Sequence, residues 1–98
     1  MVDNTNKYKD ILIPIIEKYL PTCRILIFGS RAIMQFQEGA DIDVAIDDGK
    51  PIASRLIFRI LDDIEESSLP VFVDVIDFQS ASEDLKKEIL RDGVVWKN

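Results

Sequence analysis

Residues 41–47, with the sequence Asp-Ile-Asp-Val-Ala-Ile-Asp, alternate without a break between apolar side chains and acidic or small ones. Because successive side chains of a β-strand point to opposite faces, this pattern predicts a strand that is buried on one face only. The buried face would carry Ile42, Val44 and Ile46, and the other face Asp41, Asp43, Ala45 and Asp47. The chain must therefore build a sheet with a core on one side and carboxylates on the other.

Periodicity and turn residues divide the remaining sequence into helices and further strands. In chain order the expected elements are a helix at 7–20, a strand at 24–28, a short helix from Ser30, a loop at 35–40, the strand at 41–47, a helix at 51–67, a strand at 71–78, a helix ending near Leu90 and an extended tail at 94–96. The residues expected to bound the helices are Asn4 or Thr5, Pro51, Ser80 or Ser82, and Gly93. Pro14 weakens the first helix, because an interior proline removes a backbone hydrogen bond.

This order of elements predicts an α/β fold of the α+β kind, with connections long enough for crossovers between strands. A chain of 98 residues has room for one domain, which we expect to span residues 1–98. We expect a small mixed sheet with helices packed mainly on one face. The other face would form an open cleft with Asp41, Asp43 and Asp74.

The composition narrows the chemistry that such a cleft can perform. The chain has no histidine and one cysteine, which excludes Cys/His zinc sites and Ser-His or Cys-His nucleophilic pairs. A metal would have to be held by oxygen ligands, which favours Mg²⁺ or Mn²⁺.

Charge and hydropathy argue against two classes of partner. With 18 acidic and 12 basic residues the net charge is −6, so no overall field attracts nucleic acid, although a nucleoside triphosphate with its metal ions can bind locally. Apolar runs are too short to span a membrane, and the polar N-terminus does not resemble a signal peptide, so we expect a cytoplasmic protein.

Paired aspartates on one strand are typical of metal-assisted phosphoryl transfer. Asp41 and Asp43 would present their carboxylates to the same side, separated by about 7 Å of backbone. Two metal ions roughly 3.5–4 Å apart can be bridged by such carboxylates. Asp74, in the next strand, is the candidate third carboxylate, whereas Asp77 would point to the opposite face. The alternatives are a solvated strand face and, for Asp74, a charge that guards an edge strand against aggregation.

A strand that ends in Gly29-Ser30 and turns into a helix offers bare backbone, free amides and a hydroxyl to a phosphate. We interpret these two residues as the site that holds a triphosphate. Arg31 is a candidate for a further phosphate contact. The alternatives are a simple turn with a helix cap for Gly29-Ser30, and a plain surface position for Arg31.

Gly-Ser, a gap of about ten residues, Asp-Ile-Asp and a later strand aspartate together resemble the DNA polymerase β-like nucleotidyltransferase superfamily. The short chain and the Gly-Ser-Arg-Ala sequence are similar to the minimal nucleotidyltransferases (MNT) within it. The resemblance covers 25–78, and Arg-Asp-Gly-Val-Val at 91–95 is similar to the usual C-terminal end.

The resemblance implies a nucleotidyltransferase (polymerase β palm-like) fold and a role for each motif. Gly29 and Ser30, with Arg31 beside them, would bind the nucleotide, while Asp41, Asp43 and Asp74 would be the catalytic residues and hold two Mg²⁺ ions. ATP would be the substrate. It also implies a HEPN-domain toxin, encoded by the adjacent gene, to which similar antitoxins transfer AMP on a tyrosine hydroxyl.

Two positions depart from the family pattern. The chain has Ile33-Met34 where members commonly have Arg-Gly, and Ala40 where they commonly have Ser. The first change removes a basic contact and the second a hydroxyl near the metals, but neither removes a metal ligand.

Two functions remain open from the sequence. One is an Mg-dependent nucleotidyltransferase that modifies its partner, whose acceptor surface would come from another chain because 98 residues leave little room for one. The other is a non-catalytic antitoxin or adaptor that neutralises its partner by binding.

Overall fold

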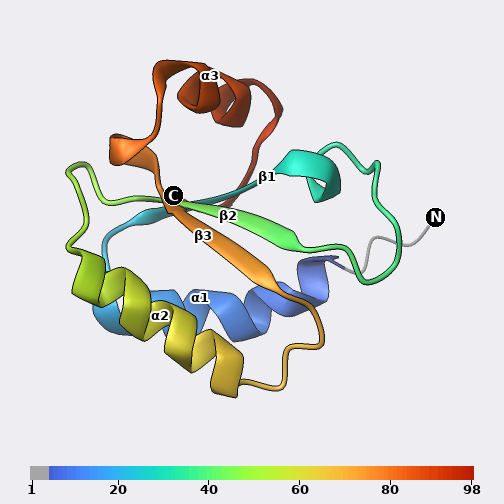
Figure 1. The fold of residues 1–98 in the computed structure, drawn as a ribbon, viewed down its shortest axis with the longest axis horizontal. Helices are drawn as coiled ribbons and strands as arrows, with labels where there is room; N and C mark the ends of the chain where they lie inside the picture. Colours follow the sequence, from blue (N-terminus) through green and yellow to red (C-terminus); the bar gives the residue numbers. More distant parts are fainter. Residues whose placement is uncertain (1–4) are drawn as a thin grey trace.

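The computed structural model describes residues 5–98 of the chain (Figure 1). The helices are α1 (Lys9–Tyr19), α2 (Ser54–Glu66) and α3 (Glu83–Asp92), the strands are β1 (Arg24–Phe28), β2 (Ile42–Asp47), β3 (Val73–Asp77) and β4 (Val94–Lys97), and the short 3-10 helices are η1 (Thr5–Tyr8), η2 (Gly29–Arg31) and η3 (Phe78–Ser80). The expected order of helices and strands is therefore confirmed, and the tail is a strand. In the described part of the chain, no helix is long and apolar enough to cross a membrane.

The four strands form one mixed sheet in the order β3-β2-β1-β4. Strand β1 is antiparallel to both β2 and β4, whereas β2 and β3 are parallel. The parallel pair is possible because α2 makes the long crossover between its strands. The edges of the sheet are β3 and β4, and β1 and β2 are its centre.

Helices α1 and α2 lie together on one face of the sheet and enclose the main core (Figure 1). The alternation read from residues 41–47 decides this arrangement, because Ile42, Val44 and Ile46 are fully buried against these helices. Burying apolar surface contributes roughly 25 cal/mol per Å² and holds this side of the sheet closed.

The opposite face is covered in part by α3, which Figure 1 shows on the other side of the sheet from α1 and α2. A smaller apolar cluster beneath it comprises Leu26, Phe28, Ala45, Phe78 and Ile89, with Ile76 and Leu85 packed against them. The expectation of helices mainly on one face holds for α1 and α2. The rest of the second face carries the acidic side chains.

Two helix boundaries differ from those expected. Helix α2 begins at Ser54 rather than at Pro51, because the backbone of Ala53, its N-cap, is extended with ψ +133°. The Ile52 amide in the segment before it donates to the Asp77 carboxylate at 2.9 Å. Thr5 lies in η1 and does not cap α1 directly, while Asn4 is outside the described residues.

The last helix is bounded as expected. Ser82 caps α3 by accepting a hydrogen bond from the Leu85 amide, and the helix stops at Gly93. A Cβ on Gly93 would collide with the Ile89 carbonyl oxygen, so glycine is needed there for space.

Candidate active site

Three adjacent strands bring the predicted site residues to one end of the sheet. Across the antiparallel pair Phe28 lies opposite Asp43, so the turn at Gly29 comes directly after the residue that faces this carboxylate. Across the parallel pair Asp43 lies opposite Asp74. Neighbouring strands are about 4.8 Å apart, so two carboxylates and the turn share one small area.

Gly29 lies against the Asp43 carboxylate. Its φ is +73°, a conformation that side chains with a Cβ rarely adopt. A Cβ placed on Gly29 would fall on Oδ2 of Asp43 and 3.2 Å from its carboxyl carbon. Glycine is therefore required both for the turn and for the close approach of the turn to the carboxylate.

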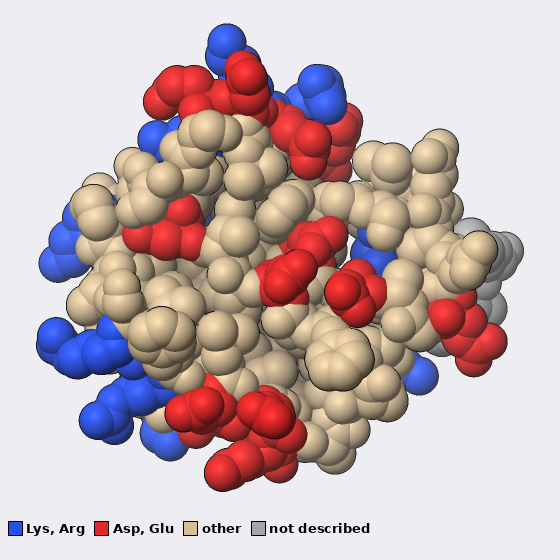
Figure 2. Space-filling view, viewed as in Figure 1, with Lys and Arg blue, Asp and Glu red and all other residues tan. Residues whose placement is uncertain are grey.

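The three predicted carboxylates differ in exposure. Asp43 is half-buried, whereas Asp41, just before β2, and Asp74 are exposed. None of the three accepts a hydrogen bond or forms an ion pair with another residue between 5 and 98. Figure 2 shows acidic side chains gathered in the middle of the face, where the ribbon view has the strands of the sheet.

The local charge is unfavourable for an ionised Asp43. Burial is the largest cause that raises the pKa of the Asp43 carboxyl above its ordinary value. The other causes are the negative charges of Asp74, Asp41 and Glu88. A carboxylate that is partly removed from water and surrounded by like charges is suited to a cation.

The carboxylate oxygens at this site are the type of ligand that a hard divalent ion prefers, but they do not converge on one point. Mg²⁺ prefers oxygen ligands and is held in nucleotide sites by one or two carboxylates together with substrate phosphates. Asp43 and Asp74 are register partners on neighbouring strands and are the residues that could supply such carboxylates. Among the described residues, however, no three acidic, histidine or cysteine side chains converge on one point that could hold an ion. Part of the coordination would therefore have to come from outside these side chains.

The phosphate-sized turn is a 3-10 turn, η2, rather than the first turn of an α-helix. The Gly29 carbonyl accepts from the Ala32 amide at 3.1 Å, and the Ser30 carbonyl accepts from the Gln35 amide at 2.9 Å. These two backbone hydrogen bonds stabilise the turn and the residues that follow it. The Ser30 hydroxyl makes no hydrogen bond to another described residue.

Arg31 lies inside the protein, with 4% of its surface exposed. Its guanidinium donates to the Ala40 carbonyl and to the Thr5 hydroxyl. The predicted phosphate contact of Arg31 stays a prediction, and the geometry favours a structural role for this side chain.

Glu88 of α3 was absent from the residues inferred from sequence, yet its charge reaches Asp43. The helical spacing of Leu85 and Ile89 indicates which side of α3 is buried, but it does not say against which face of the sheet the helix packs. The sequence therefore held no signal that placed Glu88 near the aspartates.

Comparison with known proteins shows which family has this arrangement. Residues 10–97 match the family model described as polymerase beta, nucleotidyltransferase. A probable protein adenylyltransferase, MntA, of Haemophilus influenzae is 32% identical over 81 residues, which cover 83% of this chain and 71% of that protein.

Solved structures share the fold at lower sequence identity. A toxin–antitoxin complex with AMP-PNP matches with a TM-score of 0.77 and 21% identity, over 90% of this chain and 71% of the matched chain. A chain in the structure of a tri-AMPylated Shewanella oneidensis HEPN toxin in complex with an MNT antitoxin also matches. Its TM-score is 0.72 and its identity 21%, over 93% of this chain and 70% of the matched chain. The matched family model, which spans the sheet, the Gly29 turn and all three aspartates, shows that this chain belongs to the polymerase beta nucleotidyltransferase family.

Proposed function

We propose that this chain is an Mg-dependent protein adenylyltransferase that transfers AMP from ATP to a tyrosine hydroxyl of a HEPN-domain partner, and so acts as an antitoxin. The observation that carries the proposal is the contact between Gly29 and Asp43. It sets a turn suited to phosphates directly against a carboxylate that no described residue neutralises. The relative named as a probable protein adenylyltransferase supports the protein substrate.

The Gly29-Ser30 turn would bind the phosphates of ATP. The missing side chain at Gly29 lets a phosphate approach the backbone, and the Ser30 hydroxyl is available to donate to a phosphate oxygen. The net charge of −6 would repel ATP, so the same site needs cations.

Asp41, Asp43 and Asp74 would hold two Mg²⁺ ions, or Mn²⁺ in their place, together with the phosphates. When bound, the ions would neutralise the phosphates and stabilise charge at the attacking and leaving oxygens. Asp43 would be the central residue of the three, because it is the register partner of Asp74 and lies two residues after Asp41. Phosphate oxygens and water would supply the remaining ligands of the ions.

The reaction forms one bond and breaks another at the α-phosphorus of ATP. The acceptor oxygen of the tyrosine would attack this phosphorus while the bond to the β-phosphate oxygen breaks. AMP becomes attached to the tyrosine, pyrophosphate leaves, and the phenolic proton is released to solvent. The turn would keep the triphosphate in line for this displacement.

The acceptor would come from another chain. One solved structure with this fold contains a HEPN toxin bound to an MNT antitoxin. Exposed apolar side chains such as Phe72 and Phe58 provide surface that a protein partner can cover. ATP as the substrate and such a toxin as the partner would place the protein in the cytoplasm.

The test is transfer of label from α-labelled ATP, in the presence of Mg²⁺, to the purified HEPN-domain protein encoded by the adjacent gene. We expect label on a partner tyrosine with the unmodified chain and a loss of more than about 100-fold with Asp43→Asn, since even outer-sphere partners of metal ligands are worth 10–100-fold. Mass spectrometry of the partner would locate the modified residue and count the nucleotides.

Asp47→Asn is the matched control. Asp47 lies on the same strand and on the same face as Asp43, but at the other end of the pair formed by β1 and β2. This variant should transfer label at the unmodified rate. Tight complex formation and toxin neutralisation that persist in Asp41→Asn and Asp43→Asn, without label in any sample, would contradict catalysis and identify a non-catalytic antitoxin.

A further inference from the structure

The buried guanidinium of Arg31 donates hydrogen bonds to two uncharged oxygens. Its Nε and Nη2 donate to the Ala40 carbonyl at 3.0 and 2.7 Å, and Nη1 donates to the Thr5 hydroxyl at 2.9 Å. No carboxylate among residues 5–98 forms an ion pair with it. A buried cation that binds a backbone carbonyl with two donors is built to hold that carbonyl in place.

Two aromatic rings complete the environment of the guanidinium. The Phe36 ring lies 4.6 Å from its central carbon, and the Tyr8 ring lies 5.8 Å from it. Phe36 belongs to the loop between η2 and β2, whereas Tyr8 belongs to η1. The side chain of Arg31 therefore joins the end of the phosphate turn, the loop and the N-terminal 3-10 helix.

The carbonyl that Arg31 holds precedes Asp41 in the chain. Asp41 follows Ala40 directly and comes before the first residue of β2, so no ladder hydrogen bond of the strand includes it. The Ala40 amide is tied to the Gln37 carbonyl at 3.0 Å, within the loop itself. The orientation of Asp41 thus depends on how this loop is fastened to the body of the protein.

We propose that Arg31 is a positioning residue that fastens residues 35–40 and so directs Asp41 toward Asp43 and Asp74. The inference rests on the proposed function for its effect on transfer, but the fastening itself can be measured separately. It also differs from the phosphate contact expected from the sequence. The Arg31 side chain is buried, and its Nε and Nη2 both donate to the Ala40 carbonyl. It would have to leave this position to reach a phosphate.

Arg31→Lys separates the two roles. Lysine keeps the charge and binds phosphate well as a point charge, but it lacks the planar fork. We expect kcat to fall roughly 100-fold with KM for ATP unchanged, because a displacement of about 1 Å near the chemistry has that effect. A phosphate contact would instead give a higher KM for ATP in Arg31→Gln and substantial recovery in Arg31→Lys, and that result would overturn the proposal.

Hydrogen exchange tests the fastening without catalysis. Amides of residues 35–41 should exchange faster in Arg31→Lys and, to a smaller degree, in Thr5→Val, which removes one partner and leaves the arginine in place. Mn²⁺ binding, followed by isothermal titration in the presence of a nonhydrolysable ATP analogue, should weaken in parallel. Arg55→Lys, at an exposed position of α2, should change neither.

Unchanged exchange at 35–41 in both Arg31→Lys and Thr5→Val would overturn the inference. If Arg31→Lys fails to fold, Thr5→Val and Phe36→Leu carry the same test, because each weakens one contact of the guanidinium. Absence of label transfer by the unmodified chain would refute the proposed function, while the exchange data would still decide whether Arg31 fastens the loop.

Discussion

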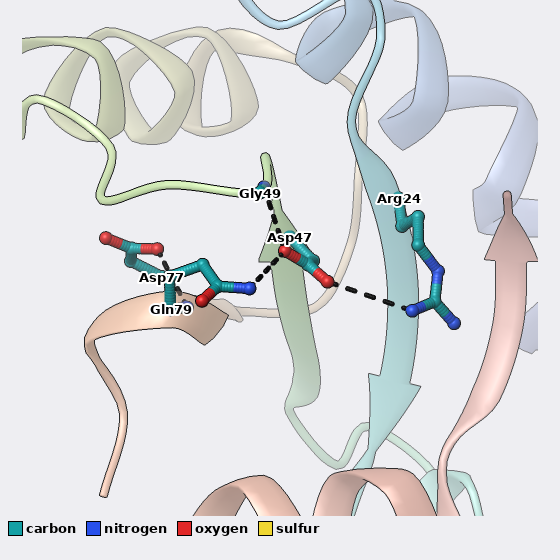
Figure 3. A network of polar contacts seen from close by, with 5 residues as sticks. All are labelled: Arg24, Asp47, Gly49, Asp77 and Gln79. Carbon is teal, nitrogen blue, oxygen red and sulfur yellow. Dashed lines mark hydrogen bonds and ion pairs between the residues drawn. The ribbon is translucent and has the colours of Figure 1, made fainter.

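The two ends of the sheet carry aspartates on the same two strands, but in opposite environments. At one end Asp43 and Asp74 face each other across β2 and β3 and receive no hydrogen bond from the described residues. At the other end Asp47 and Asp77 belong to a network of polar contacts (Figure 3). One sheet therefore contains one acidic pair with hydrogen-bond partners and one without them among the described residues.

The network end uses its carboxylates to hold the chain together. Asp47 accepts from the Gly49 amide and the Gln79 side chain, at 2.9 and 2.8 Å, and pairs with Arg24 at 3.7 Å (Figure 3). Asp77 accepts from the amides of Ile52 and Gln79 and from the Ser80 hydroxyl. These bonds join the ends of β2 and β3 to the segments that follow them.

The comparison indicates how to tell a structural carboxylate from a functional one. Satisfied acceptors stabilise the fold, since each hydrogen bond contributes about 1 kcal/mol and a lost partner costs more. Unsatisfied like charges oppose folding and remain available to a cation. We therefore propose that the end with Gly29 is the functional end, and substitutions at the two ends should have different consequences.

The largest contrast is expected between two glycines with nearly the same backbone. Gly29 has φ +73° and lies against Asp43, whereas Gly49 has φ +76° and open space where its Cβ would be. Gly29→Ala should lower adenylyl transfer about 100-fold, since its Cβ displaces the Asp43 carboxylate. Gly49→Ala should retain activity while losing about 1 kcal/mol of stability to backbone strain.

Transfer assays and urea denaturation of both variants would measure this contrast. Gly39→Ala, at φ +84° with nothing near its Cβ, is a second reference for strain alone. Equal loss of transfer in all three variants would mean that strain, and not the contact with Asp43, is the cause.

The next effect is on stability at the network end. Asp77→Ala should lower the free energy of unfolding by about 2 kcal/mol, because it leaves the half-buried amides of Ile52 and Gln79 without their acceptor. In a domain of this size the melting temperature should fall by roughly 10 °C. Circular dichroism melting would measure the change. Asp74→Ala should show no such loss, and a similar loss in both variants would remove the distinction between the ends.

A smaller effect should appear in the pH dependence of stability. Because the pKa of Asp43 is raised in the folded state, the folded protein holds this proton more tightly than the unfolded chain. Stability from this group therefore falls as pH rises from the ordinary carboxyl pKa through the raised one. At pH 7 in EDTA, Asp43→Asn should be more stable than the unmodified chain by less than about 1 kcal/mol, because solvent screens the charges around this partly exposed group.

Denaturation at several pH values would follow this difference, which should shrink as the pH falls below the ordinary carboxyl pKa of 3.8 and nearly vanish by pH 3, where Asp43 is mostly protonated in both states. Added Mg²⁺ should also reduce it, by stabilising the unmodified chain through binding to its folded state. A difference that is the same at pH 3 and pH 7 would show that repulsion at Asp43 is not its source.

The faces of the sheet could be predicted from sequence because a period of two decides them locally. Ile42, Val44 and Ile46 are buried as the alternation indicates, and the family model confirms the nucleotidyltransferase inferred from the Gly-Ser and Asp-x-Asp spacing. The roles of the individual site residues stay predictions.

The remaining features depend on contacts between distant segments. Helix α2 begins later than expected, and the segment before it is tied by the Ile52 amide to Asp77, 25 residues away. The burial of Arg31 was also unexpected, because arginine is rarely buried without a carboxylate and its partners here are a backbone carbonyl and a hydroxyl. No local pattern records which neutral oxygens a folded chain will bring together.

The smallest effect concerns strain at the functional end. Met34 is the one residue other than glycine in the described part of the chain with a positive φ, +61°, at a position where the resemblance seen in the sequence implies glycine. Met34→Gly should raise the free energy of unfolding by about 0.5 kcal/mol, because relief of the left-handed conformation exceeds the entropy lost by glycine. Met34→Ala, which keeps the strain and removes the side chain, should give no gain in urea denaturation. If alanine stabilises as much as glycine, the exposed methionine side chain, and not the backbone, is the source of the cost.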